Sequence, residues 1–385
     1  MTIDIWFQAN SLWLIKLQND LPSSIMKILV ISRYENFIRH RSEAEIFIRL
    51  AELGVSITIM TTPNSPFYDI FSQVGIKVVP HHPETRFSKK SILPIREELL
   101  IGNYDILHLF NSKSIPAGII ASRGINVKII TYRGAKGPYW HDISAYFGHY
   151  HPRVNAIICL SEYVKSSILA QGIMSSKKLH VIHKGVDISW FNSVSPATYD
   201  FQKSNLNCKI ITCVAHLRPV KGVDFLIQAA KMLSGNRDLH FVFIGRGTND
   251  PDFQRKLSKL PNHKRLHGIG EVEDIRSHMK ACDIYVQPSI SEGLGKTVIE
   301  AMAYSKPIIV TRCGGPEEII QDQMSGEVVP VKNADALANS IINFLNDMDR
   351  AKRMGQSAKS FLIKKLNIEL TVDKTSKVYR SLLIN

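Results

Sequence analysis

The sequence lacks long apolar segments, short internal repeats and low-complexity tracts. No run of eighteen or more apolar residues occurs, so no stretch has the composition of a membrane-spanning helix. With 385 residues, 44% of them hydrophobic, the chain is too long for one ordinary core. Two globular domains are therefore expected.

Cysteine is scarce, and its spacing excludes two kinds of site. The cysteines form no CxxC pair, and each lies in or beside an apolar run. This pattern predicts buried free thiols in a reducing compartment, not a disulfide framework or a zinc site. The five are Cys159, Cys208, Cys213, Cys282 and Cys313.

The net charge of +14 comes without any nucleic-acid-binding motif. Residues 1–190 carry 21 Lys and Arg against 14 Asp and Glu, and residues 191–385 carry 27 against 20. Positive charge spread so evenly suits an anionic ligand or an acidic membrane surface. We therefore expect no nucleic-acid partner and possible peripheral contact with an anionic membrane.

The first 25 residues precede the first strand-like run and allow two interpretations. Asp4 near the start makes MTIDIWFQANSLWLIKL a poor secretory signal. The segment is either an extension from an upstream start codon or a short amphipathic stretch that contacts a membrane.

From Lys27 onward, short apolar runs alternate with stretches of helical length. Apolar runs bounded by turn residues are typical of strands buried on both faces, and this alternation predicts a parallel sheet wrapped by helices. In the first half the strand-like runs are 27–32, 55–61, 76–80, 104–110, 126–132, 154–161 and 179–187.

Residues 192–206 are polar without clear periodicity and predict a linker. The alternation then restarts, with strand-like runs at 208–215, 239–245, 264–270, 283–289 and 306–311 and helical stretches at 223–234, 251–260, 272–282 and 293–304. The expected fold class is α/β, with two doubly wound, Rossmann-like parallel-sheet domains facing across a cleft that holds the site. The expected domains are residues 1–192 and 193–365, with a helix in 366–385 packing back toward the first.

The segment SEGLGKTVIEAM places two carboxylates, Glu292 and Glu300, around a glycine-rich turn that enters a helix. Backbone N–H groups at such a helix start, together with the helix dipole, favour an anion such as phosphate. Gly293 and Gly295 permit close backbone approach. Carboxylates that accept hydrogen bonds from vicinal hydroxyls suit sugar rings. The alternative is structural: Glu292 caps the helix and Glu300 is exposed.

Three more strand exits in this half are rich in glycine or in cations. VAHLRPVKG places His216, Arg218 and Lys221 after a strand, and FIGRG and TRCGG follow two others. Any one of these could be a plain turn. Because the carboxyl ends of parallel strands share one edge of a sheet, we expect the four exits to meet there.

These segments occur in the order of a known family. They are VAHLRPVKGVDFLIQA, FIGRG, HGIGEVEDI, CDIYVQPSISEGLGKTVIEAMAYSKPIIVTRCGG and PEEII. In them the C-terminal half resembles glycosyltransferase family 4, the retaining nucleotide-sugar transferases of GT-B fold. The N-terminal half is similar more loosely, in MKILVISRY, YDILHLF, IICLSEYVKSSIL and VIHKGVD.

The resemblance implies a role for each matching residue. Lys221 and Arg218 would neutralise the donor diphosphate, Glu292 would hold the transferred sugar and its phosphate, and Glu300 would bond the ribose. The first domain would lie on the acceptor side and the second would bind the nucleotide sugar. The remaining donor-side positions are Gly293, Leu294, Gly295, His216, Gly245, Gly270 and Val272.

The sequence departs from the family pattern in three places. Members commonly have an arginine where His216 stands, so either His216 or Arg218 fills that role. The usual Gly-Gly turn after the first strand is replaced by RYENFIRHRSEAE, and TYRGAKG brings Arg133 where members often have a histidine. On the acceptor side the candidates are Arg133, His108 and His141, although histidines at strand exits are more often structural.

The function expected from the resemblance is retaining transfer of a sugar from a UDP- or GDP-sugar to a glycan or lipid-linked acceptor. The context would be bacterial envelope polysaccharide or lipopolysaccharide synthesis, in the cytoplasm or at the inner face of its membrane. No cofactor and no metal are expected, because no DxD-like acid pair lies in a suitable loop. The alternatives are another GT-B enzyme, such as a sugar-nucleotide epimerase, or a non-catalytic nucleotide-sugar-binding protein.

Overall fold

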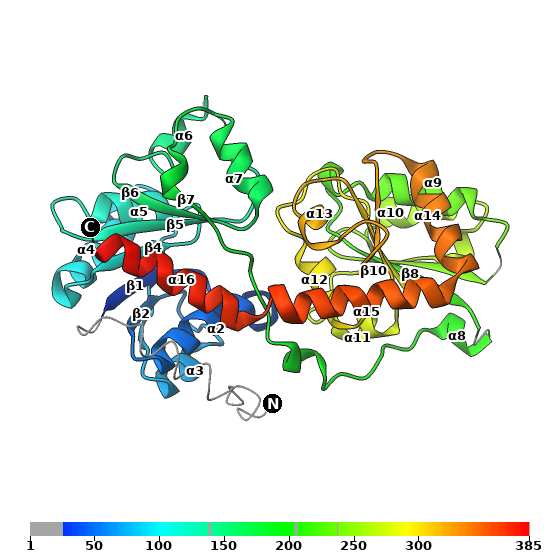
Figure 1. Cartoon of the computed structure of the whole chain (residues 1–385), viewed down its shortest axis with the longest axis horizontal. Helices are drawn as coiled ribbons and strands as arrows, with labels where there is room; N and C mark the ends of the chain where they lie inside the picture. The colour runs from blue at the N-terminus through cyan, green and yellow to red at the C-terminus, as the bar shows by residue number, and fades with distance from the viewer. Residues whose placement is uncertain (1–25, 138, 140, 205–206, 237, 385) are drawn as a thin grey trace. The chain divides into compact units, whose positions relative to one another are not determined.

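The computed structural model describes residues 26–137, 139, 141–204, 207–236 and 238–384 (Figure 1). The chain divides into two compact units. The N-terminal unit comprises the residues up to Asp187 together with those from Leu366, and the C-terminal unit is Ile188–Lys365. The two interpretations of residues 1–25 lie outside the described residues.

The N-terminal unit is built on a seven-stranded sheet in the order β3-β2-β1-β4-β5-β6-β7. Every neighbouring pair is parallel. The chain therefore starts in the middle of the sheet, builds one edge and returns to build the other, which is the doubly wound order. The strands are β1 Lys27–Ile31, β2 Ser56–Met60, β3 Lys77–Val79, β4 Ile106–Leu109, β5 Lys128–Arg133, β6 Val154–Cys159 and β7 Leu179–Val181.

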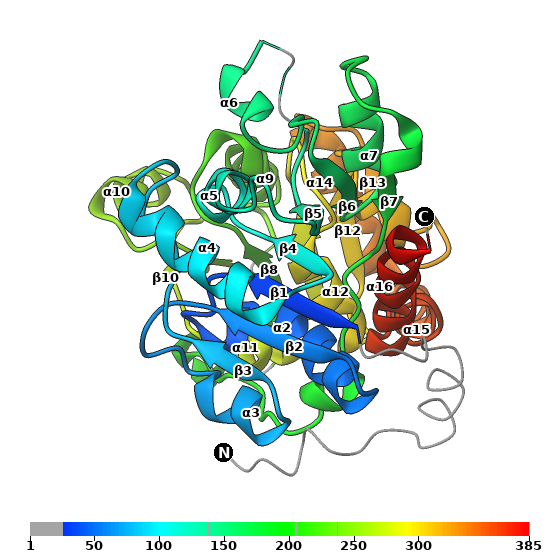
Figure 2. The ribbon, with the colours of Figure 1, turned by 90° about the vertical axis from the view of Figure 1, so that its left-hand side faces the viewer.

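Helices cover both faces of this sheet because its strands carry apolar residues on both faces. Ile28 and Val30 of β1 pack in one core with α2, α3 and α16, whereas Leu29 and Ile31 pack in another with α4, α5 and α7. Figure 2 shows α4 and α5 side by side, and Figure 1 shows α16 along α2. The helices are α2 Phe37–Glu52, α3 Tyr68–Gln73, α4 Lys89–Gly102, α5 Ser114–Ala121, α6 Ile143–Tyr146, α7 Glu162–Leu169 and α16 Ile368–Leu383, with the 3₁₀-helix η2 Ser176–Lys178.

The C-terminal unit repeats this plan with a six-stranded sheet in the order β10-β9-β8-β11-β12-β13. All its pairs are parallel. Its order reverses between β8 and β11, so the exits of these two strands flank the point where doubly wound sheets bind ligands. The strands are β8 Lys209–Val214, β9 Leu239–Ile244, β10 Leu266–Gly270, β11 Ile284–Gln287, β12 Ile308–Thr311 and β13 Glu327–Val329.

The helices of this unit also pack on both faces of the sheet. Ile211 and Cys213 of β8 join a core with α9, α10 and α14, and Ile210 faces the other way, toward Phe201 of α8. The α-helices are α8 Asp200–Ser204, α9 Val223–Met232, α10 Pro251–Ser258, α11 Arg276–Ala281, α12 Lys296–Ala303, α13 Pro316–Ile319, α14 Ala334–Asn346 and α15 Met348–Lys365. The 3₁₀-helices are η3 Ile188–Phe191, η4 Pro219–Lys221 and η5 His263–Arg265.

Two doubly wound parallel sheets confirm the expected fold class. The five cysteines are free and buried, as the sequence predicted. Across the described residues, no helix is both long and apolar enough to cross a membrane. In the same part of the chain, no three His, Cys, Asp or Glu side chains gather as a metal site would require.

Three elements differ from their sequence predictions. The strand expected at 179–187 ends at Val181, because the chain then turns to α16, where Thr371 Oγ1 accepts from Gly185 N at 2.8 Å and donates to the His183 carbonyl at 2.9 Å. The helix expected from 272 begins only at Arg276. The strand β13 was not predicted at all.

The unit boundary lies at Asp187, not at the expected 192, because the next residues pack in the C-terminal unit. Trp190 and Phe191 are buried, and Phe191 meets the ring of Tyr304 edge-on. The predicted linker also contains the helix α8. Residues 188–204 therefore pack on this unit and are not a free linker.

Arg276 holds this segment in place. Its guanidinium lies 3.6 Å above the Trp190 ring, donates to the Trp190 carbonyl at 2.6 Å and pairs with Asp274 at 2.6 Å. Only 2% of the Arg276 side chain is exposed. A buried guanidinium needs such partners, since its charge has left water.

We predict that Arg276→Met destabilises the protein by about 3 kcal/mol, because the Asp274 carboxylate and the Trp190 carbonyl lose their donor. Arg255→Met is the matched control: Arg255 is 67% exposed and pairs only with Asp252 on the same helix. The control is expected to change stability by no more than about 0.5 kcal/mol. Thermal melting of both variants beside the parent measures this, and equal melting temperatures for all three would contradict it.

Candidate active site at the carboxyl edge of the C-terminal sheet

Backbone hydrogen bonds join the exits of β8, β11 and β12. Ile290 N donates to the Val220 carbonyl at 2.8 Å, Glu292 N to the Cys313 carbonyl at 3.1 Å, and Gly315 N to the Glu292 carbonyl at 3.0 Å. The expectation that these exits meet at one edge of the sheet is confirmed.

Two glycines make this approach possible. A Cβ on Gly222 would lie 2.0 Å from the Pro288 carbonyl oxygen, and one on Gly315 would lie 2.0 Å from the Gly293 carbonyl oxygen. Real Cβ atoms do not approach backbone so closely, so any side chain here would push the exits apart.

The exits of β9 and β10 meet in the same way. Gly245 N donates to the Gly270 carbonyl at 2.8 Å, and Gly270 N donates to Thr248 Oγ1 at 2.9 Å. The backbone amides of these two expected donor-side glycines are therefore already bonded within the protein, and they join the exits of β9 and β10. Val272, just beyond, is half-buried against the apolar cluster of Ile210, Val242 and Ile244.

The ion pair between Lys221 and Glu292 is the centre of the site. Lys221 Nζ donates to Glu292 Oε2, across the point where the strand order reverses. The two side chains are 18% and 19% exposed, so the pair is partly shielded from water yet open to a ligand. The ammonium supplies a positive charge and the carboxylate supplies acceptor oxygens.

A hydrogen-bonded chain that the sequence reading missed orients Glu292. Gln287 Nε2 donates to Glu292 Oε2 at 3.0 Å, and Gln287 Oε1 accepts from Thr297 Oγ1 at 3.1 Å. Thr297 in turn accepts from the hydroxyl of the fully buried Tyr285 at 2.5 Å. These bonds fix which end of the Gln287 amide faces Glu292. The signal that could have found Gln287 is a polar residue inside a strand buried throughout.

The helix α12 begins at Lys296, four residues after Glu292. Its N-cap is Gly295, with φ of 89°, and makes no side-chain capping bond. The N–H groups at the start of a helix, together with the helix dipole, favour an anion. Leu294 is buried and anchors the turn. Glu292 is not the N-cap of this helix, and its Oε1 accepts from Gly293 N at 3.3 Å.

Glu300 is buried within α12 and not exposed, so the alternative interpretation fails for it as well. It is 7% exposed, and its nearest ion-pair partner is Lys296 at 3.8 Å. Burial raises the pKa of Glu300, opposed by the positive charge of Lys296. Glu292 and Glu300 have different partners and do not act as a close carboxylate pair.

His216 and Arg218 do not join the Lys221–Glu292 pair. His216 Nδ1 accepts from Arg246 N at 3.0 Å, which links the exits of β8 and β9 and keeps this nitrogen unprotonated. Arg218 is exposed and lines a separate pocket of about 570 Å³ with residues of α9 and α10. Of the three expected loop cations, the structure brings only Lys221 to Glu292.

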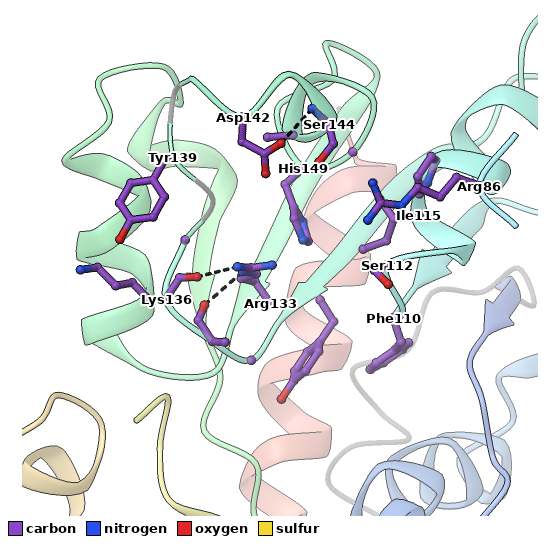
Figure 3. Close-up of a pocket in the computed structure, with 17 residues that line it drawn as sticks. Arg86, Phe110, Ser112, Ile115, Arg133, Lys136, Tyr139, Asp142, Ser144 and His149 are labelled. Atoms are coloured by element: carbon purple, nitrogen blue, oxygen red, sulfur yellow. Dashed lines mark hydrogen bonds between the residues drawn. The ribbon is translucent and has the colours of Figure 1, made fainter. Parts of the chain in front are cut away.

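The acceptor-side candidate Arg133 lines a pocket of about 560 Å³ in the N-terminal unit (Figure 3). It ends β5, and its guanidinium donates to the Ala135 and Lys136 carbonyls at 3.1 and 2.5 Å. Burial lowers the pKa of Arg133. The pocket also contains the side chains of Arg86, Phe110, Ser112, Ile115, Lys136, Tyr139, Asp142, Ser144 and His149.

The two histidine candidates differ. His108 is 2% exposed, its Nδ1 bonds the Tyr379 hydroxyl at 2.6 Å, and burial lowers its pKa to about 3. It is a neutral core residue linking β4 to α16, so its assignment as an acceptor contact was wrong. His141 is exposed and stacks on Tyr139 at 5.4 Å, beside the pocket. The histidine that lines the pocket is His149.

Comparison with known proteins identifies the family. The models for Glycosyl transferases group 1 and for Glycosyltransferase Family 4 match residues 197–361 and 44–190. An uncharacterized glycosyltransferase of Methanocaldococcus jannaschii is 30% identical over 275 residues, 71% of each chain. The chain therefore belongs to the group 1, family 4 glycosyltransferases.

Two further proteins are similar over most of the chain. The UDP-Gal:alpha-D-GlcNAc-diphosphoundecaprenol alpha-1,3-galactosyltransferase of Escherichia coli is 26% identical over 319 residues, 77% of this chain and 80% of that protein. The crystal structure of Anabaena HepE in complex with UDP-glucose has a TM-score of 0.74, with 18% identity, and covers 92% of this chain and 99% of its own. The fold is thus the GT-B fold of its structural neighbours.

The burial of Glu300 predicts a measurable dependence of stability on pH. A carboxyl with a raised pKa binds more protons when folded than when unfolded, so stability falls as pH rises above the unfolded pKa of about 4.3. Glu300→Gln removes this loss. We expect it to melt at a higher temperature than the parent at pH 7–8, with the difference vanishing below about pH 4. Glu273→Gln, at an exposed carboxylate, is the control. Parallel curves of melting temperature against pH for Glu300→Gln and the parent would contradict this.

Proposed function

We propose that the protein transfers a sugar from a nucleotide-diphosphate sugar to a lipid-linked acceptor with retention of the anomeric configuration. The observation that carries this is the Lys221–Glu292 pair at the reversal of strand order, beside the uncapped start of α12. A cation, the start of a helix and a carboxylate at one edge match the diphosphate and hydroxyl groups of such a donor.

The ligand-free ion pair implies an exchange of partners on donor binding. The phosphate oxygens compete with Glu292 for Lys221, and a released Glu292 carboxylate then accepts hydrogen bonds from sugar hydroxyls. Gln287 keeps the carboxylate in place during this exchange, because its bond to Oε2 does not depend on Lys221. Glu300, whose carboxylate is disfavoured by burial, gains partners if the ribose hydroxyls bond it.

The reaction follows from these contacts. The bond between the anomeric carbon and the phosphate oxygen breaks as negative charge builds on the leaving diphosphate. Lys221 and the first amides of α12 stabilise that charge. The acceptor hydroxyl forms the new bond on the same face, and its proton passes to the leaving phosphate. Neither Glu292 nor Glu300 acts as the general base in this scheme.

The donor and the acceptor are proposed from relatives. The E. coli relative is named for UDP-Gal and a diphosphoundecaprenol acceptor, and the HepE crystal holds UDP-glucose. These favour a UDP-sugar and a lipid diphosphate acceptor in bacterial envelope glycan synthesis, at the cytoplasmic side of the membrane. We also propose that transfer needs no metal ion, since Lys221 supplies the charge at the diphosphate.

The first test identifies the donor and the residues. Thermal shifts with UDP-, GDP- and ADP-sugars should show stabilisation by one class, because only the folded state binds it. Lys221→Gln and Glu292→Gln should each lower acceptor-dependent nucleotide release by about 10²-fold or more. The control Lys256→Gln changes an exposed lysine paired with Asp224 and should retain the parent rate.

Three outcomes would contradict the proposal. They are no shift with any nucleotide sugar, nucleotide turnover that needs no acceptor, and parent rates in both site variants. Turnover without acceptor would favour an epimerase or hydrolase. Inhibition by EDTA that Mg²⁺ or Mn²⁺ restores would overturn the metal-free part alone.

A second prediction concerns the positioning chain behind Glu292. Thr297→Val removes one of the two hydroxyls that bond Gln287 Oε1, the other being that of Tyr285 at 3.1 Å, so the amide is held less firmly. We expect kcat to fall about tenfold with a smaller change in the donor KM, because Glu292 is misplaced chiefly in the transition state. Thr297→Ser keeps the hydroxyl and should restore kcat. Equal kcat values in the valine and serine variants would show that the chain does not act on Glu292.

A further inference from the structure

Four exposed apolar side chains gather beside the 560 Å³ pocket of the N-terminal unit. Phe87, Ile143, Tyr146 and Phe147 are 52%, 74%, 42% and 50% exposed. We call these four the apolar rim. The rings of Phe87 and Phe147 meet edge-on at 5.7 Å, so the loop before α4 and the end of α6 form one surface. Scattered exposed apolar residues need no explanation, but a contiguous group marks an interaction site.

The rim and the pocket share the same two segments of chain. Arg86 lines the pocket and the next residue, Phe87, belongs to the rim. Asp142 and Ser144 line the pocket and enclose Ile143, again of the rim. Figure 3 shows Arg86 and Asp142 on different sides of the pocket, with His149 between them and Arg133 below. A partner that covers the rim therefore lies at the entrance of the pocket.

Positive charge surrounds the rim. Residues 84–90 and 133–147 carry five Lys and Arg against two Asp and Glu. Lys89 and Lys90 are exposed at the start of α4, next to Phe87, and Lys136 lines the pocket below the ring of Tyr139. Exposed aromatic and aliphatic side chains among basic groups are the combination that binds the headgroup region of anionic membranes.

We propose that the apolar rim docks on an anionic lipid bilayer and opens the adjoining pocket to an acceptor whose hydrocarbon chain stays in the membrane. The proposal rests on the proposed function for the acceptor, but not for the docking itself. The pocket suits the charged end of such a lipid, since Arg86, Arg133 and Lys136 all line it. The lipid headgroups meet the rim and its lysines, and the acceptor headgroup enters beside them.

Vesicle binding by the full chain tests the docking. We expect co-sedimentation with vesicles of phosphatidylglycerol and phosphatidylcholine, and at least tenfold weaker binding to phosphatidylcholine alone. Ile143→Asp combined with Phe147→Asp should weaken binding to the anionic vesicles at least tenfold. Lys89→Gln combined with Lys90→Gln should weaken it severalfold and reduce its salt dependence.

The matched control carries the same change elsewhere. Met232→Asp combined with Met324→Asp places two aspartates at C-terminal-unit residues that are 53% and 65% exposed. This variant should bind anionic vesicles nearly as the parent does. Equal binding by the rim variant and the parent, or equal loss in both aspartate variants, would overturn the proposal. So would a parent dimer in solution that the rim variant dissociates, because the rim would then bind a second copy.

An activity measurement separates this proposal from the proposed function. The rim variant should retain the parent rate with a short-chain, water-soluble acceptor and lose at least tenfold with the lipid acceptor in vesicles. Equal losses with both acceptors would overturn the docking role. If the parent transfers no sugar to any acceptor yet still binds anionic vesicles through the rim, the proposed function fails and the docking surface stands.

Discussion

The site depends on how closely the backbone segments approach at the carboxyl edge of the C-terminal sheet. Gly222 lies against the Pro288 carbonyl and Gly315 against the Gly293 carbonyl, and neither position has room for a Cβ. This contact brings Lys221, from one loop, within hydrogen-bonding distance of Glu292, from another. The sheet order determines where the two loops meet, because β8 and β11 are neighbours at the point where the order reverses. The glycines set the distance.

The acidic residues of the site also lower the stability of the ligand-free protein. Glu300 is buried with Lys296 as a distant ion-pair partner, and burial is the main cause that raises its pKa. A neutral residue of the same shape would avoid that cost in the ligand-free protein. The Lys221–Glu292 pair offsets its own burial by mutual attraction, and under the proposed function a bound diphosphate would separate its two members. Acids held at such a cost in stability are candidates for ligand binding.

The sequence predicted these features unequally, for physical reasons. Strands buried on both faces leave long apolar runs, so nearly all were found, whereas β13 is only three residues, begins with Glu327 and gave no such signal. The convergence of the glycine-rich exits followed from parallel topology. The position of the Arg218 side chain could not be predicted in this way, because the direction of a side chain on a loop depends on contacts that the local sequence does not encode. Gln287 was not predicted as a site residue, because its role in orienting Glu292 depends on its hydrogen bonds to Thr297 and Glu292.

His108 shows why the acceptor side was harder to predict. A histidine at a strand exit has the same local sequence whether it faces a pocket or the core. The packing of α16 against His108 determines its position in the core. This helix begins 260 residues later in the chain and places the Tyr379 hydroxyl beside Nδ1 of His108. The same helix bonds Gly185 and His183 through Thr371, so the C-terminal residues complete the core of the N-terminal unit.

The loops after β4 and β5 form the charged side of that unit, and there the Arg133 guanidinium donates to carbonyls of its own loop. Since those bonds fix the guanidinium while leaving it at the pocket wall, the N-terminal unit retains a positioned cation at this strand exit. Each unit thus places a cation at a carboxyl edge of its parallel sheet. In the C-terminal unit Glu292 is its acid partner, and in the N-terminal unit the apolar rim lies nearby.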